Sequence, residues 1–146
     1  MNKIALKPSR TESIEIHRQA IRDDKLVYVI VMSKPIKYPD GKSKIGYIGT
    51  TGAGIYRVAH SGAHRATTLL REHGQKSLKL FTITCSKRQG LQGSAGLLEK
   101  ALLATFRREF GSVPKANKQG KNVKKPEALK WFTRARLEGV IEKYSQ

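Results

Sequence analysis

The most continuous hydrophobic segment of the chain, residues 26–32, is rich in β-branched residues and lies just ahead of Pro35. A run of this kind is too short for a typical helix, so it predicts a strand buried on both faces. Pro35, Pro39, Asp40 and Gly41 then predict a loop, in which Pro39-Asp40-Gly41 is typical of a turn. Residues 44–49 predict a second strand. An antiparallel pairing is the simplest connection between the two strands.

Helical periodicity is clearest over residues 95–110, where Leu98, Leu102, Phe106 and Phe110 recur at every fourth position. Gly111 follows directly and predicts the end of this helix. Before it, the pattern favours a helix over residues 55–60, a break at Ser61-Gly62, and a second helix from residue 63 to His73.

Three weaker segments complete the prediction. Residues 77–85 alternate in a way that predicts a third strand with both faces partly covered, and residues 126–143 predict a last helix. The polar residues 1–25 predict a short accessory helix that reaches Ile21, with Thr11 or Ser13 as its N-cap.

The order of these elements predicts an α+β fold, a sandwich in which helices flank a small three-stranded antiparallel sheet. We expect three parts: an accessory segment over residues 1–25, a domain over residues 26–120, and a basic helical extension over residues 121–146. The length of 146 residues suits a single core without metal or disulfide staples.

Charge narrows the class of partner. The 29 Lys and Arg residues outnumber the 11 Asp and Glu residues and give a formal net charge of +18. Such a surplus attracts polyanions, with nucleic acid ahead of an anionic membrane surface. The longest apolar run is far shorter than the about 20 residues of a membrane span, so we expect no spanning segment. The single cysteine, Cys85, excludes an internal disulfide and a cysteine-based zinc site, and it suits a reducing, cytoplasmic compartment.

Several polar positions are candidates for chemistry. The glycine-rich residues 49–54 could cradle a phosphate or simply form a tight strand-to-helix turn. Arg57, His60 and His64 would share one side of a helix if it were continuous. Glu99 lies beside the apolar stripe of its helix, so its carboxylate must be paired, protonated or bound to a metal.

Taken together, these residues resemble a known nuclease pattern. Tyr28 lies in the first strand, Tyr47-Ile48-Gly49 in the second, Arg57 and Glu99 in successive helices, and Asn117 follows Pro114. Over residues 26–120 this arrangement resembles the GIY-YIG nuclease family. Where the family has its first motif, Gly-Ile-Tyr, this chain reads Val27-Tyr28-Val29. Residues 34–43 form a longer link between the first and second motifs than the family usually has.

The resemblance implies a divalent-metal-dependent endonuclease that hydrolyses phosphodiester bonds, with DNA as the main substrate class. Glu99 would hold one Mg²⁺ or Mn²⁺ ion, and Arg57 would bind the scissile phosphate. A tyrosine would help to activate water, which its ordinary pKa of about 10 allows only with help from nearby positive charge. The implied catalytic residues are Tyr28, Tyr47, Arg57, His64 and Glu99.

Further residues are expected to contact nucleic acid, because basic residues cluster after each of these segments. They are Arg57, His60, Arg65, Lys115, Asn117, Lys118 and Lys121. Asn117 is also expected to fix a nearby backbone group. Two alternatives stay open at this stage: a nucleic-acid-binding module that keeps the fold without the chemistry, and a basic RNA-associated structural protein. The oligomeric state is left open.

Overall fold

The protein is built around a three-stranded antiparallel sheet. The structure, a computed structural model, describes residues 4–12, 15, 21–85, 93–118 and 126–146. The strands lie in the order β2-β1-β3, so β1 is central and pairs with both neighbours. Their bounds are β1 (Leu26–Tyr38), β2 (Gly41–Thr51) and β3 (Leu78–Ile83).

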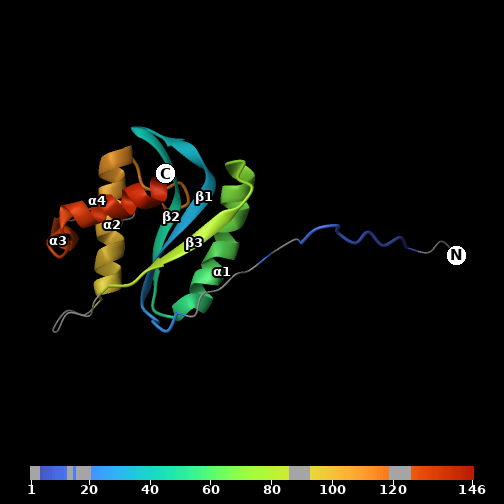
Figure 1. Cartoon of the computed structure of the whole chain (residues 1–146), viewed down its shortest axis with the longest axis horizontal. Coiled ribbons are helices and arrows are strands. Elements are labelled where there is room, and N and C mark those ends of the chain that lie inside the picture. Colours follow the sequence, from blue (N-terminus) through green and yellow to red (C-terminus); the bar gives the residue numbers. More distant parts are fainter. Residues whose placement is uncertain (1–3, 13–14, 16–20, 86–92, 119–125) are drawn as a thin grey trace.

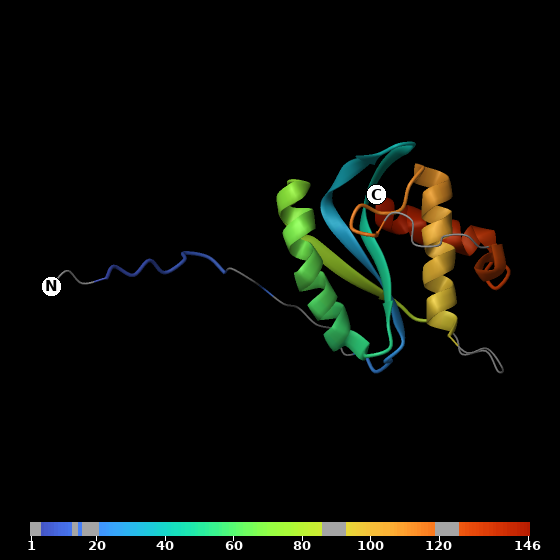
Figure 2. The ribbon, with the colours of Figure 1, turned by 180° about the vertical axis from the view of Figure 1, so that it is seen from behind.

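Helices cover both faces of this sheet, which confirms the predicted α+β class (Figures 1 and 2). On one face lies α1 (Gly54–Ala66), which continues into the π-helix η1 (Thr67–Glu72). On the opposite face lie α2 (Ser94–Phe110) and α4 (Arg134–Ser145), with the short α3 (Pro126–Leu129) beside α2. None of these helices is long and apolar enough to cross a membrane.

The side chains of β1 alternate between two hydrophobic clusters, one on each face. Leu26, Tyr28 and Ile30 pack with Val58 and Leu69 under α1 and η1. Val27 and Val29 instead join the larger cluster beneath α2 and α4. Because both faces are covered, the first part of β1 is almost fully buried, as the continuous apolar run predicted.

The hairpin formed by β1 and β2 is longer than expected. The loop predicted before residue 44 is strand instead, because β1 runs on to Tyr38 and β2 begins at Gly41. Pro35 lies in a register irregularity between the pairs Val31↔Ile45 and Ile36↔Ser43. A proline is tolerated there because its missing N–H removes no ladder hydrogen bond.

The predicted break of the helix at Ser61-Gly62 is wrong. Helix α1 continues through both residues. Gly62 is buried against β3, where a Cβ atom would come within 2.7 Å of the Leu80 Cδ2 atom. This glycine therefore serves close packing between a helix and a strand rather than helix termination.

The other end of the chain differs in a similar way. The helix predicted over residues 126–143 is two helices, α3 and α4, because the chain turns at residues 130–133 and Thr133 is extended. By contrast, the end of α2 is confirmed at Gly111, whose N–H bonds to the Arg107 carbonyl at a φ of 80°. The described residues 4–12, 15 and 21–25 contain no helix, and the rest of the predicted accessory helix lies outside the described residues.

Candidate active site

Two tyrosines lie side by side on the face of the sheet that α1 covers. Tyr28 is the register partner of Gly49, and Tyr47 is the partner of Ile30, so both rings point to the same side. Their ring centroids are 5.7 Å apart. A Cβ atom on Gly49 would come within 2.5 Å of the Tyr47 ring and 2.9 Å of the Tyr28 hydroxyl. Only glycine at position 49 therefore leaves room for this tyrosine pair.

The hydroxyl of Tyr28 is directed to α1. It donates a hydrogen bond to the Ser61 Oγ atom at 2.6 Å. Burial raises the pKa of Tyr28, and the hydrogen bond with Ser61 offsets this only in part. Tyr28 is therefore a protonated phenol at neutral pH, which makes it a donor and not a general base.

Arg65, a residue of α1, holds Tyr47 of β2 in place. The Arg65 guanidinium lies 3.7 Å from the Tyr47 ring centroid, and its Nη2 donates to the Tyr47 hydroxyl at 3.0 Å. Its Nη1 donates to the Ala116 carbonyl at 3.3 Å. The buried Nε atom has no hydrogen-bond partner within the described part of the chain. Arg65 thus orients Tyr47 and ties α1 to the segment that follows α2.

The exposed edge of α1 carries the other predicted residues of this helix. Arg57, Ser61 and Arg65 are spaced four apart, so they follow one side of the helix from solvent toward the tyrosines. Arg57 Nη1 donates to His60 Nδ1 at 3.1 Å, since arginine has no acceptor. Arg57, His60 and His64 are all exposed. The continuity of α1 therefore keeps Arg57, His60 and His64 on one helix, whereas the residue of this helix that contacts Tyr47 is Arg65.

Glu99 lies in a different layer of the molecule. It is half-buried on α2, which covers the opposite face of the sheet from the two tyrosines. Arg108, nine residues further along α2, bonds to Glu138 of α4, and nine residues make about two and a half helical turns, which puts Arg108 on the side of the helix opposite to Glu99. Glu99 is therefore on the side of α2 that is turned away from α4.

The donor set for a metal ion is sparse. Within the described residues, no group of three or more His, Cys, Asp or Glu side chains could hold a metal ion. A single carboxylate such as Glu99 still suits Mg²⁺, because this ion keeps most of its water ligands and uses one or two carboxylates. Glu99 could therefore hold Mg²⁺ as an ion that keeps most of its water ligands.

Asn117 closes the outer edge of β2. Its side-chain oxygen accepts from the Ile48 N–H at 3.0 Å, and its amide donates to the Ile48 carbonyl at 2.8 Å. The neighbouring Ala116 N–H bonds to the Gly46 carbonyl at 2.9 Å. Asn117 is buried, and its hydrogen bonds serve the fold, in line with its expected role of fixing a backbone group.

The remaining predicted contacts flank this segment. Lys115 and Lys118 are exposed, and the backbone N–H of Lys115 donates to the buried Tyr38 hydroxyl at 3.1 Å. Lys121 lies outside the described residues. Of the glycine-rich residues 49–54, the first three belong to β2, residues 52 and 53 form the turn, and Gly54 begins α1 with a φ of 70°.

Ser61 is a site residue that the sequence analysis missed. It was assigned to a helix break, whereas it is the hydrogen-bond partner of Tyr28. The contact between Arg65 and Tyr47 was also missed, because Arg65 was expected only to contact nucleic acid. The spacing of Arg57, Ser61 and Arg65 carried the signal, but only for a helix that is continuous across Gly62.

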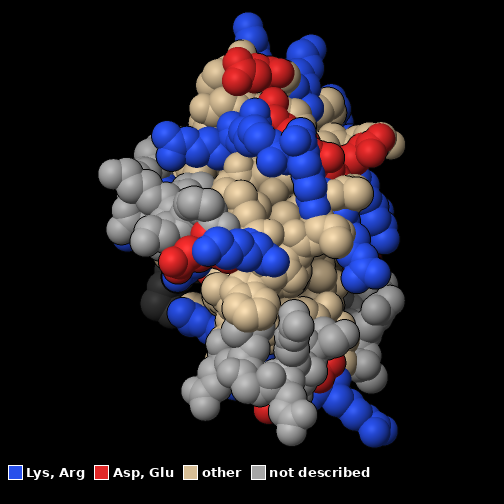
Figure 3. Space-filling view, turned by 90° about the vertical axis from the view of Figure 1, so that its left-hand side faces the viewer, with Lys and Arg blue, Asp and Glu red and all other residues tan. Residues whose placement is uncertain are grey.

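Charge differs between the two sides of the molecule. On the side where α2 and α3 lie, Asp and Glu side chains are interspersed with Lys and Arg (Figure 3). Burial, together with the charges of Glu138 and Glu142, raises the pKa of Glu109 there. Helix α1 carries no acidic residue at all. The arginines of α1 therefore have no acidic neighbour on their own helix, which favours the approach of a polyanion there.

Comparison of the chain with protein-family models, with curated proteins and with solved structures finds no match.

Proposed function

We propose that the protein is a divalent-metal-dependent endonuclease of the GIY-YIG type that hydrolyses phosphodiester bonds in nucleic acid, with DNA as its main substrate. The observation that carries the proposal is the tyrosine pair over Gly49, held in place by Ser61 and Arg65. An ordinary core needs neither two adjacent phenols nor a glycine that makes room for them. The pair lies beside the exposed, basic edge of α1.

The two tyrosines are suited to different tasks. Tyr28 stays protonated and donates to Ser61, so it positions the helix edge against the sheet. The Tyr47 hydroxyl is held by a donor, which leaves an oxygen lone pair to accept a hydrogen bond from an attacking water. We therefore assign water orientation to Tyr47 and site positioning to Tyr28.

Arg57 and the histidines supply the contacts to the reacting phosphate. A guanidinium can bind two phosphate oxygens at once and offset the charge that develops in the transition state. Arg57 is exposed, and its contact to His60 holds it at the edge of α1. His64, one turn further along, is the residue we assign to proton transfer to or from solvent.

A bound Mg²⁺ or Mn²⁺ ion would polarise the phosphate and stabilise the leaving oxygen. Glu99 is the residue that would hold it, through its carboxylate on the side of α2 turned away from α4. Substrate attraction follows from the net charge of +18 and from the absence of acidic residues on α1.

A nicking assay tests this proposal. Supercoiled plasmid is incubated with the full chain and Mg²⁺ or Mn²⁺, and relaxation is measured for wild type, Glu99→Gln and Arg57→Ala. We expect each variant to lose about 100-fold or more of the wild-type rate, since Arg57→Ala removes a positive charge at the reacting phosphate and Glu99→Gln weakens the hold on the metal ion. Chelation of the metal should abolish cleavage by the wild type.

Matched controls separate chemistry from general charge. Glu109→Gln changes another partly buried carboxylate of α2, and Arg71→Ala removes another exposed arginine, on η1. Both should retain cleavage within a few-fold of wild type. Cleavage that survives Glu99→Gln, or a purified wild type that binds DNA without cutting it, would sink the assignment.

A second candidate, a nucleic-acid-binding module without catalysis, is favoured by one observation. Glu99 and the tyrosine pair lie on opposite faces of the sheet, whereas the proposed reaction uses both. This candidate predicts salt-sensitive binding with no metal-dependent turnover. The nicking assay distinguishes the two directly.

A further inference from the structure

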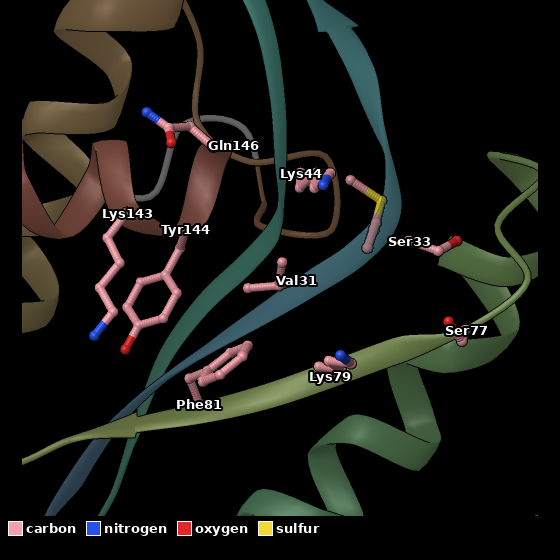
Figure 4. A pocket seen from close by; sticks show the side chains of 10 residues that line it. Val31, Ser33, Lys44, Ser77, Lys79, Phe81, Lys143, Tyr144 and Gln146 are labelled. Carbon is pink, nitrogen blue, oxygen red and sulfur yellow. The ribbon is translucent and has the colours of Figure 1, made fainter.

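An open hollow lies between the sheet and the end of α4, for the most part on the face opposite to the tyrosine pair. It has a volume of about 380 Å³ and is lined by residues of all three strands and of the last turn of α4 (Figure 4). In this view Val31 of β1 lies near the middle of the hollow, with Phe81 of β3 below it and Tyr144 of α4 beside it. A volume of this size is in the range of small-ligand sites.

Three lysines from three different elements border this hollow. They are Lys44 of β2, Lys79 of β3 and Lys143 of α4. No Asp or Glu lines it, and none of the three lysines forms an ion pair within the described part of the chain. The lining therefore carries positive charge without a compensating carboxylate, which favours an anion over a cation in this hollow.

The same hollow offers an aromatic surface. The rings of Phe81 and Tyr144 are in contact, with centroids 4.9 Å apart and planes inclined by 35°. The Lys143 Nζ atom lies 5.5 Å from the Tyr144 ring centroid. Phe81 is 37% exposed, although aromatic rings are more stable when buried. An exposed ring next to lysines is the combination on which unpaired bases stack while their phosphates are neutralised.

We propose that this hollow binds single-stranded nucleic acid, with a base on Phe81 and the adjacent phosphates on Lys44, Lys79 and Lys143. An unpaired strand is the fitting occupant because bases within a duplex do not expose their faces for stacking. The site lies across the sheet from the tyrosine pair. The site takes the same class of ligand as the proposed function, nucleic acid, but it does not require that the protein cleave this ligand.

Binding of a fluorescently labelled single-stranded oligothymidine, measured by anisotropy, tests this site. A chelator is present throughout, so cleavage cannot affect the result, and failure of the endonuclease proposal would not imitate failure of this one. The site variant is the triple change Lys44→Gln, Lys79→Gln, Lys143→Gln. Its matched control is Lys37→Gln, Lys42→Gln, Lys130→Gln, which removes the same charge from exposed positions outside the hollow.

We expect the site variant to bind about fivefold or more weakly than the control variant. Its salt slope, log Kd against log salt concentration, should fall by about 2 relative to wild type, because each lost phosphate contact on a single strand removes about 0.7. Equal affinities and equal slopes for the two triple variants would show that binding depends on the total positive charge and not on this hollow, and would overturn the proposal.

A second pair of variants tests the ring. Phe81→Leu should weaken single-strand binding about fivefold or more, since stacking contributes substantially per base. Leu80→Ala is its control, because Leu80 has the same exposed fraction on the same strand but points to the opposite face. Unfolding in urea confirms that each variant is folded. An unchanged affinity in Phe81→Leu, or a duplex that competes as strongly as the single strand, would contradict the proposal.

Discussion

At the scale of single residues, three tyrosines of one hairpin have three different surroundings. Tyr28 is bonded to a serine and Tyr47 is bonded to an arginine, and both belong to the site. Tyr38 lies in the core, where its hydroxyl donates to the Ile45 carbonyl at 2.7 Å and accepts from the Lys115 N–H at 3.1 Å. The partners of each hydroxyl therefore separate Tyr38, which belongs to the core, from the two tyrosines of the candidate site.

The buried Tyr38 predicts a pH dependence of stability. Burial raises the pKa of Tyr38 well above its ordinary value of 10.0, so folding favours the protonated phenol. The associated stability is fully present below pH ~10 and is lost as the pH rises above it, by up to about 1.4 kcal/mol per pH unit. Tyr38→Phe should be about 1–2 kcal/mol less stable than wild type at pH 8, because two hydrogen bonds are lost.

Urea unfolding between pH 8 and pH 11 measures this effect. The difference between wild type and Tyr38→Phe should shrink as the pH rises, while lysine deprotonation affects both proteins alike. Tyr56→Phe serves as the control, because Tyr56 is 78% exposed and its curve should run parallel to that of wild type. A constant difference between wild type and Tyr38→Phe across this range would contradict the prediction.

At the scale of elements, the continuity of α1 through Ser61 and Gly62 positions the residues of the candidate site. Gly62 lets the helix approach β3, and the same approach sets Ser61 against Tyr28 and Arg65 against Tyr47. A glycine in the middle of a helix costs about 1 kcal/mol relative to alanine. The close contact with Leu80 explains why this position accepts that cost.

A double-mutant cycle on Gly62 and Leu80 tests this explanation. In a Leu80→Ala background, Gly62→Ala should stabilise the protein by about 1 kcal/mol through helix propensity alone. In the wild-type background, the new Cβ meets the Leu80 side chain, and overpacking of about 1–3 kcal/mol should cancel or reverse that gain. Urea unfolding of the four proteins gives the coupling energy. A coupling near zero would show that Leu80 does not restrict position 62.

At the scale of the whole molecule, the segment after α2 joins the two layers. It pairs with the outer edge of β2 through Ala116 and Asn117, and it accepts a hydrogen bond from Arg65 of α1. An edge strand that is covered in this way cannot pair with another chain. The segment therefore protects the sheet and supports the site from behind Tyr47.

Asn117→Ala tests the importance of this closure. The substitution removes both hydrogen bonds to Ile48 and leaves its buried N–H and carbonyl groups without these partners, at about 1–3 kcal/mol each. We expect a loss of about 2–4 kcal/mol in the free energy of unfolding in urea. Lys118→Ala, at an exposed neighbouring position, should stay within about 0.5 kcal/mol of wild type. A similarly small effect of Asn117→Ala would mean that the segment is not needed for stability.

Local patterns predicted much of the architecture. The apolar run of β1, the turn at residues 39–41 and the periodicity of α2 with its stop at Gly111 all reflect sterics and burial within a few residues. The motif order placed Tyr47 on the second strand and Arg57 on the helix that follows it, and both lie on those elements. These features depend on neighbours in sequence, which is why they could be predicted.

The positions that were mistaken depend on distant contacts. Gly62 was assigned to a break because its partner, Leu80, lies on another element. Pro35 was assigned to a loop because the register irregularity that accommodates it is set by pairing with β2. No local pattern distinguishes a glycine that ends a helix from one that lets the helix pack closely.

The sequence by itself determined the strongly basic charge, the central strand, the helix that carries Glu99 and the tyrosine motif. The tertiary structure alone decided that Ser61 and Arg65 hold the two tyrosines, that Asn117 closes β2, and that Glu99 lies across the sheet from them. It also decided that three lysines distant in sequence share one hollow. The physical reason is that composition and periodicity act along the chain, whereas a site is made by side chains that only folding brings together.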